Sequence, residues 1–218
     1  NMCGRFVNLN TVEKLDKIFS ISKHDNIKYK ISYNISPSQL SLIITNFKFL
    51  KIENAKWGYD FFDKQRNIEK QIINSRLETI KEKMLFKDSF EKRKCIIPAN
   101  GYYEWTLKNN IKIPYFIHIP EKETIYFAGI WRYLNIKVNT LKVFSIITKP
   151  ANRLLKEIHH RMPVILSFNE SKEFLENNNS DYLNDIKPSI EEYFEFFKVS
   201  KFVNNPINNS YECIKPIN

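Results

Sequence analysis

Five apolar segments between Cys95 and Thr148 constrain the fold most, because only short polar breaks separate them. They cover 95–98, 101–105, 113–119, 124–131 and 141–148. In 113–119, isoleucine and tyrosine alternate with the residues between them, which is the two-residue period of a half-buried strand. Lys108, Asn109 and Asn110 have the residue types of a hairpin turn. The run favours antiparallel strands over regular βαβ alternation.

The flanking regions add helices and further strands. Helices are predicted over 11–20, 77–90, 169–177 and 188–197, with a short one after Pro150, and strands over 40–45, 162–166 and 198–204. Asn10 is the expected cap of the first helix, and Met84 is expected on the inner face of the second. No repeat or linker divides the 218 residues. We predict a single α+β domain over 2–218, with a mainly antiparallel, barrel-like sheet and flanking helices.

The cysteine count limits the chemistry and the compartment. Cys3, Cys95 and Cys213 form no CxxC pair, which argues against a disulfide framework and against a zinc site. We expect no metal and no cofactor. No run of about 18 apolar residues spans a membrane, and no secretory signal is apparent. The expectation is a monomeric, cytoplasmic protein associated with the nucleoid.

The charge balance suggests a polyanionic partner. The net charge is +10, which suits nucleic acid, although a composition rich in Lys, Asn and Ile gives a similar excess without any such partner. Arginine separates these interpretations better, because it supplies only seven of the 34 basic residues. Where lysine is the default, an arginine indicates a need for a planar, bidentate donor such as a phosphate clamp.

The amino-terminal segment has a cysteine directly after the expected start methionine. We interpret Asn1 as a remnant before the native start at Met2, and methionine is commonly removed before a small residue such as Cys3. Cys3 would then carry a free α-amine and a thiol, which titrate near pH 7.7–8 and 8.5. Together they can capture an aldehyde as an imine and then as a thiazolidine. The alternative is a buried cysteine that packs as a small hydrophobe.

Three polar segments contain further candidates for chemistry. Glu104 lies in an aromatic strand. If its side chain faces inward, burial would raise its pKa; the alternative is a solvated position on an edge strand. His159 precedes a buried strand and can exchange protons near pH 7, or it is one of two surface histidines with His160. Asn74 and Arg76 lie where a strand meets a helix. Asn74 could bind a carbonyl and Arg76 a phosphate, or the segment could simply cap the helix.

Taken in order, the motifs resemble one family. They are Met-Cys-Gly-Arg-Phe (2–6), Tyr-Asn-Ile-x-Pro-Ser-Gln (33–39), Asn-x-Arg-x-Glu-Thr (74–79), Cys-Ile-Ile-Pro-Ala-x-Gly-Tyr-Tyr-Glu-Trp (95–105), Phe-Ala-Gly-Ile-Trp (127–131), Ile-His-x-Arg-Met-Pro-Val-Ile-Leu (158–166) and a closing Val-Ser-x-x-Val-Asn (199–204). Over about 3–213 the chain resembles the SRAP family, the SOS response-associated peptidase-like proteins of the DNA damage response and DNA repair.

The resemblance implies a function and a reaction. Members bind single-stranded DNA and crosslink to abasic sites, which shields the lesion. Cys3 would be the nucleophile that forms a thiazolidine with the ring-opened sugar, and Asn74 would position it. Glu104 would shuttle protons around the amine. His159, rather than His160, would assist ring opening.

The resemblance also implies a DNA-binding surface. Arg5, Arg76 and Arg161 match positions that hold DNA phosphates. Thr148 matches a threonine at the same face, and Pro37 lies in the loop that wedges the strand. The expected partner is single-stranded DNA with abasic sites. A departure from the family pattern occurs at 59–62, where Tyr-Asp-Phe-Phe replaces a Pro and further tryptophans, so base stacking there would use phenylalanine.

The resemblance suggests two further activities and leaves two alternatives. A weak abasic-site lyase activity and self-removal of the initiator methionine are expected beside the crosslink, and the family name itself suggests a hydrolase. A chain that retains Asn1 and Met2 is expected to be inactive. One alternative is a cysteine peptidase that uses Cys3 with His159 and Asn74. The other is a non-catalytic nucleic-acid-binding module.

Overall fold

The computed structural model describes residues 3–21, 27, 29–63, 65–120, 122–136, 139–177, 179 and 181–217. The strands are β1 (Arg5–Asn8), β2 (Ser32–Ile35), β3 (Leu40–Asn46), β4 (Leu50–Trp57), β5 (Tyr59–Asp63), β6 (Ile68–Ile72), β7 (Asn74–Arg76), β8 (Lys94–Ala99), β9 (Gly101–Lys108), β10 (Ile111–His118), β11 (Ile125–Ile136), β12 (Asn139–Pro150), β13 (Arg161–Pro163), β14 (Ile165–Leu166) and β15 (Glu195–Lys198). The α-helices in these residues are α1 (Val12–Phe19), α2 (Met84–Lys92), α3 (Phe168–Glu176) and α4 (Tyr182–Asp185).

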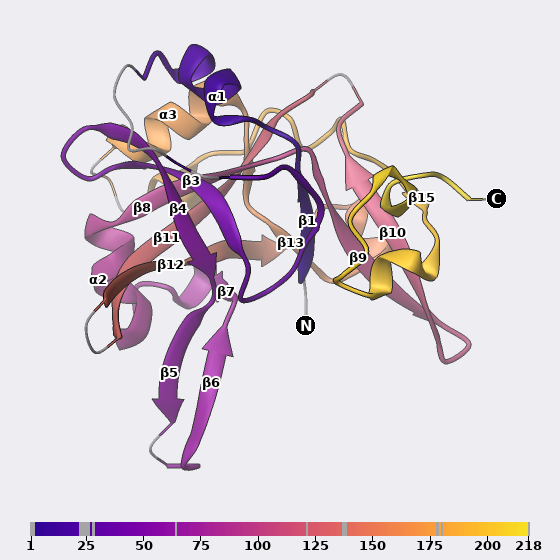
Figure 1. Ribbon diagram of the computed structural model, residues 1–218, viewed down its shortest axis with the longest axis horizontal. Helices are drawn as coiled ribbons and strands as arrows, with labels where there is room; N and C mark the ends of the chain where they lie inside the picture. The colour runs from indigo at the N-terminus through magenta and orange to yellow at the C-terminus, as the bar shows by residue number, and fades with distance from the viewer. Residues whose placement is uncertain are drawn as a thin grey trace.

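Five strands close into a barrel. Their order is β12-β4-β3-β8-β11, and β11 pairs back onto β12 to complete the ring. Neighbours are antiparallel except β4 and β12, which run parallel. The expectation of a mainly antiparallel, barrel-like sheet with flanking helices is therefore confirmed. A second sheet, of order β15-β10-β9-β1-β2, lies to one side, and β5 and β6 project as a hairpin (Figure 1).

Strand alternation divides the apolar side chains into two layers. One layer packs against α1, α2 and α3 on the outside of the barrel, and it contains Leu42, Ile44, Ile96, Ala128 and Val143. The other layer fills the barrel, and it contains Ile43, Ala55, Ile97, Phe127 and Phe144. Every barrel strand is thus buried on both faces over part of its length, which explains its long apolar run.

The barrel has two ends, and β1 packs against one of them. At that end β3 begins while β4 and β12 finish, and Phe6 of β1 places its ring 5.1 Å from Trp57 and 5.7 Å from Phe127. We call it the Cys3 end. At the opposite end β3 turns into β4, and β11 turns into β12; we call it the hairpin end. The Cys3 end holds most of the predicted site.

Several local predictions are confirmed. Helix 11–20 corresponds to α1, and helix 169–177 corresponds to α3. Asn109 and Asn110 form the turn between β9 and β10 with φ of 51° and 62°, which is the left-handed region that such a turn requires. The cap of α1 differs, because the Thr11 side chain, not Asn10, accepts a hydrogen bond from the Lys14 amide.

Other local predictions were wrong. Segment 188–197 is not a helix: α4 ends at Asp185, and β15 pairs with β10, with Phe197 opposite Phe116. Tertiary pairing with an exposed strand edge overrides the helical spacing here. Segment 198–204 is not a strand either, because a 3-10 helix covers Lys201–Asn204. The predicted helix 77–90 is divided between a 3-10 turn and α2, which leaves Met84 95 % exposed.

Gly129 is required where β11 approaches the barrel interior closely. A Cβ atom there would lie 2.5 Å from Ile97 Cδ1 and 3.0 Å from the Ser145 carbonyl oxygen. We expect Gly129→Ala to lower the free energy of unfolding by about 1–3 kcal/mol, the usual cost of overpacking a core. Urea unfolding followed by tryptophan fluorescence measures it. An unchanged midpoint would mean that Ile97 can move aside without cost.

Candidate active site

The pairing of β1 with β9 brings Cys3 to Glu104. Arg5 is opposite Tyr103 in this ladder, so the chain before Arg5 reaches the next residue of β9. The Cys3 backbone nitrogen donates a hydrogen bond to Glu104 Oε2 at 2.8 Å, and the Trp105 amide donates to Oε1 at 3.1 Å. Glu104 is only 3 % exposed. Burial raises the pKa of its carboxyl, although these two hydrogen bonds act in the opposite direction.

The Cys3 side chain is buried at this end of the barrel rather than exposed in an open cleft. Cys3 is 0 % exposed and belongs to the interior cluster with Phe6 and Trp57. Burial, followed by the nearby Glu104 charge, raises the pKa of its thiol. Its φ is 44°, the left-handed region that a non-glycine residue seldom adopts. Such strain commonly marks functional positions. The family resemblance implied proximity to Glu104, and the complete burial agrees with the alternative of a cysteine that packs as a small hydrophobe.

His159 lies on the face of β9 that also carries Glu104. Thr106, two residues beyond Glu104 and on the same face, donates its hydroxyl to the Ile158 carbonyl at 2.9 Å. His159 Nδ1 accepts a hydrogen bond from the Arg161 amide at 3.1 Å, so the neutral ring carries its proton on Nε2. Partial burial lowers the pKa of His159, which keeps the ring neutral near pH 7.

His160 is also close to the carboxyl. Its ring centroid lies 4.2 Å from that of His159. Burial is the main influence on the pKa of Glu104, and the positive form of His160 opposes it slightly. Sequence comparison with the family pattern selects His159 alone, whereas the fold brings both rings to this site.

Strand β7 carries Asn74 and Arg76 to the same end of the barrel. It runs parallel to β12, with Asn74 opposite Ile146 and Arg76 opposite Thr148. The preceding residue, Ile73, packs against the interior cluster that contains Cys3, and its carbonyl accepts a hydrogen bond from Trp57 Nε1 at 3.0 Å. Arg76 is exposed. Asn74 is therefore placed beside the barrel opening, while the Arg76 side chain extends into solvent.

Arg161 has a carboxylate partner. Its two terminal nitrogens donate to the two Glu78 oxygens at 2.5 and 2.9 Å, and Nη2 also donates to the Thr148 carbonyl at 2.8 Å. Arg161 is 8 % exposed and Thr148 is 0 % exposed. The hydrogen bond from Arg161 lowers the pKa of Glu78. This bidentate geometry is the one an arginine uses for phosphate, here occupied by an internal group.

Arg5 and Pro37 complete the set of predicted positions. The Arg5 guanidinium donates to Asn34 Oδ1 at 2.8 Å, to the Val203 carbonyl at 2.8 Å and to the Asn204 carbonyl at 3.0 Å. It thus ties β1 to the C-terminal segment. Pro37 lies in the turn between β2 and β3, which the fold places at the Cys3 end.

Four residues that sequence reasoning did not select hold this arrangement together. They are Asn34, Glu78, Thr106 and His160. Asn34 and Glu78 lie inside motifs used for the family resemblance, but their arginine partners are 29 and 83 residues away, so the sequence did not indicate the pairing. Thr106 gave no signal, because its partner is the Ile158 carbonyl, 52 residues away.

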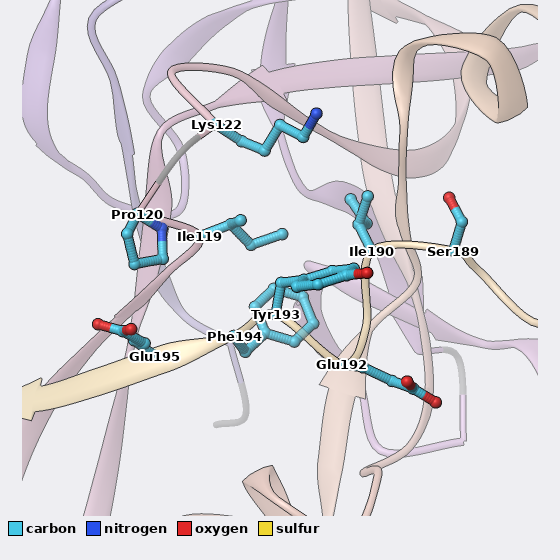
Figure 2. A pocket seen from close by; sticks show the side chains of 9 residues that line it. All are labelled: Ile119, Pro120, Lys122, Ser189, Ile190, Glu192, Tyr193, Phe194 and Glu195. Carbon is cyan, nitrogen blue, oxygen red and sulfur yellow. The ribbon is translucent and has the colours of Figure 1, made fainter.

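A separate hollow of about 750 Å³ lies between the end of β10 and segment 189–195 (Figure 2). Ile119, Ile190 and Phe194 line it, and none of the predicted site residues does. In the part of the chain that the structure describes, no group of three or more His, Cys, Asp or Glu side chains could hold a metal ion. No helix in that part has the length and apolar character needed to cross a membrane.

These features define a closed β-barrel whose amino-terminal segment presents a cysteine to a buried carboxyl, with the adjacent rings of His159 and His160 in a segment that packs on the same strand. The family model for SOS response associated peptidase (SRAP) matches residues 2–206. The chain belongs to the SRAP family.

Curated relatives have related names. Abasic site processing protein YoqW of Bacillus subtilis (strain 168) is 36 % identical over 98 % of this chain and 99 % of its own. Abasic site processing protein HMCES of Xenopus tropicalis is 29 % identical over 88 % of this chain and 68 % of its own. A crystal structure of a protein from Bacteroides thetaiotaomicron superimposes with a TM-score of 0.82 at 24 % identity, covering 99 % of this chain and 100 % of that one, which supports the fold.

Proposed function

We propose that this protein processes abasic sites in single-stranded DNA by forming a thiazolidine between Cys3 and the ring-opened sugar aldehyde. The contact between the Cys3 nitrogen and Glu104 Oε2, at 2.8 Å, carries the proposal. It places a proton acceptor directly at the atom that must act as nucleophile. The names of the curated relatives, abasic site processing proteins, support the substrate.

The reaction requires that Cys3 becomes the first residue, so that its nitrogen is an amine. The amine attacks the aldehyde carbon and gives up a proton to Glu104, which returns it to the former carbonyl oxygen to give a carbinolamine. The carbinolamine then loses its hydroxyl as water to give an imine. The thiol adds to the imine carbon, and its proton passes to the nitrogen. One C–N and one C–S bond form, and one water leaves. Removal of the preceding residues also abolishes the φ constraint at Cys3, because that torsion no longer exists.

The acid–base properties indicate that the amine reacts before the thiol. Burial and the Glu104 charge both raise the pKa of the Cys3 thiol, so the thiol stays protonated near neutral pH. Reactive thiolates need the opposite shift. This disfavours the cysteine peptidase alternative, in which a thiolate would attack first. The thiol instead closes the ring once the imine has formed.

His159 and Asn74 have distinct roles in this scheme. Neutral His159 carries its proton on Nε2 and donates it to the sugar ring oxygen, which promotes opening of the hemiacetal. Asn74, at the start of β7, would hold the sugar and the amine by its amide. An imine can also proceed to β-elimination, so a weak lyase activity accompanies the crosslink wherever ring closure is slow.

The DNA strand would follow the Cys3 end of the barrel. Arg76 is exposed and offers its guanidinium directly to a phosphate. Arg161 can do so only when a phosphate replaces Glu78, whose side chain is 43 % exposed. Arg5 supports the strand indirectly, by fixing β1 to the C-terminal segment. Pro37 lies in the turn that would separate neighbouring bases. Thr148 supports β7 from the adjacent strand β12.

A gel experiment tests the proposal. A chain that begins at Cys3 is incubated with an abasic single-stranded oligonucleotide and with an intact one, and then denatured. We expect a stable adduct with the abasic strand alone. Cys3→Ala keeps an α-amine but has no thiol, so it should lose the stable adduct and retain an imine that borohydride traps. Equal stable crosslinking by Cys3→Ala would overturn the proposal, and equal binding of both strands with no adduct would indicate a non-catalytic module.

A further inference from the structure

The hairpin end of the barrel carries exposed aromatic rings that the core does not bury. Phe47 and Phe49 are 51 % and 58 % exposed, and they flank Lys48 in the turn between β3 and β4. Lys48 makes no ion pair with any residue that the structure describes. Two outward phenyl rings with a lysine between them have the composition of a single-strand contact, in which bases stack on rings and the cation meets phosphate.

The rings form a supported surface rather than isolated side chains. Phe47 packs edge-on against Trp131 with centroids 5.7 Å apart, and Tyr133 also packs edge-on against Trp131, with centroids 5.1 Å apart. Lys142 Nζ lies 4.6 Å from the Trp131 centroid and 5.5 Å from that of Tyr133. Tyr133 is 51 % exposed. We call Phe47, Lys48, Phe49, Tyr133 and Lys142 the Phe47 patch, with Trp131 as its floor.

A hollow of about 320 Å³ adjoins Phe47. Its polar lining consists of Asn46, Glu91, Lys92, Lys94 and Asn177. Ligand sites begin at about 300 Å³, so this space suits a unit as small as a nucleotide. Amide groups can meet a base edge, lysines can meet a phosphate, and Phe47 provides the wall on which a base would stack.

The local charge favours a polyanion. Lys48, Lys51, Lys92, Lys94 and Lys142 lie in or beside the patch and the hollow, so five lysines face the three carboxylates Glu53, Asp88 and Glu91. Glu53 pairs with Lys51 and Lys142, and Asp88 pairs with Lys92, so among the described residues Lys48 and Lys94 are the lysines of this surface without a carboxylate partner. The surface is thus positive and aromatic, unlike the hollow of Figure 2, where Glu192 and Glu195 oppose a single lysine.

We propose that the Phe47 patch is a second binding surface for single-stranded nucleic acid, separate from the abasic-site reaction at the Cys3 end. Between Leu40 and Asn46, β3 spans about 20 Å, which separates the two surfaces along the barrel. A strand held at the Cys3 end therefore reaches the patch only if it extends well past the lesion. The proposal rests on the proposed function only in taking DNA as the nucleic acid.

The test compares oligonucleotide lengths with a matched pair of double variants. Phe47→Ala/Phe49→Ala removes the exposed rings. Leu107→Ala/Ile111→Ala is the control, because those side chains are 63 % and 51 % exposed beside lysines on another hairpin but are not aromatic. Fluorescence anisotropy measures Kd for intact single strands of roughly 4 and roughly 30 nucleotides, because single-strand-binding folds have site sizes of about 4–16 nucleotides.

We expect the phenylalanine double variant to bind the long strand about tenfold more weakly than the wild type, with the short strand unaffected. The control should match the wild type on both. Lys48→Ala should reduce the slope of log K against log salt by about 0.7 on the long strand alone. Unchanged long-strand affinity, or the same loss on both lengths, would overturn the proposal.

Two further measurements separate the alternatives. If the phenylalanine variant abolishes self-association seen for the wild type in analytical ultracentrifugation, the patch is an interface between copies and the proposal fails. Crosslinking of a short abasic strand is measured in parallel. Its absence in the wild type would overturn the reaction proposed for Cys3, whereas the intact-strand comparison would still decide the role of the patch.

Discussion

A chain whose Cys3 nitrogen remains in an amide bond to residue 2 should leave abasic DNA free of any adduct, stable or borohydride-trapped. The nitrogen lone pair of an amide is delocalised into the carbonyl, so it does not attack an aldehyde. The thiol alone gives only a reversible hemithioacetal, and its raised pKa slows even that step. A chain that begins at Cys3 should form the adduct under the same conditions. Denaturing gels with and without borohydride, and intact mass, measure both.

The two chains differ only before Cys3, so DNA binding and folding provide the control. Both should bind an intact single strand with similar affinity and unfold at similar temperature. A difference in adduct formation between the two chains also separates this scheme from peptidase chemistry, which needs a thiol but no free amine. An adduct of the expected mass on the chain with residue 2 attached would contradict the amine mechanism.

The barrel could be predicted from the sequence because its strands are buried on both faces. Long apolar runs between 95 and 148 leave few alternatives to strands, and the turn at Asn109 and Asn110 has a strong local signal. The prediction of a helix over 188–197 was wrong for the opposite reason. The apolar spacing of this segment suits a helix, but the open edge of β10 offers Phe116 and Ile117 as partners for a short strand, and sequence spacing contains no information about that edge.

The candidate site was predictable in its members more than in their contacts. The motifs select Cys3, Glu104 and His159, and the ladder between β1 and β9 brings the first two together. The arginines show the limit. Arg161 has the residue type of a phosphate clamp, yet its donors are held by Glu78, and Arg5 is held by Asn34 and backbone carbonyls. A residue type indicates what a side chain can bind, and only the fold decides whether an internal group binds it first.

Glu104→Gln should slow crosslinking by a chain that begins at Cys3 by about 10²–10⁴-fold, the usual contribution of a positioned acid or base. Glutamine preserves the size of the side chain and can still accept one hydrogen bond, but it cannot take the proton from the amine. The rate is measured in single-turnover reactions across pH. Glu53→Gln, a change to a largely buried carboxylate at the hairpin end, is the matched control and should react at the wild-type rate.

The pH profile distinguishes proton transfer from a structural effect of the same substitution. Burial raises the pKa of Glu104, so its carboxylate becomes available only as the pH rises through that raised value. The wild-type rate should therefore rise in two limbs, one for Glu104 and one at higher pH for the Cys3 amine. The variant should keep only the higher limb. The same shift means that the protonated carboxyl stabilises the fold at low pH, and that this contribution is lost as the pH rises through the folded-state pKa. The variant should lack that pH-dependent loss of stability. A slower variant with both limbs intact would make Glu104 a structural residue, and the amine would need a different proton acceptor.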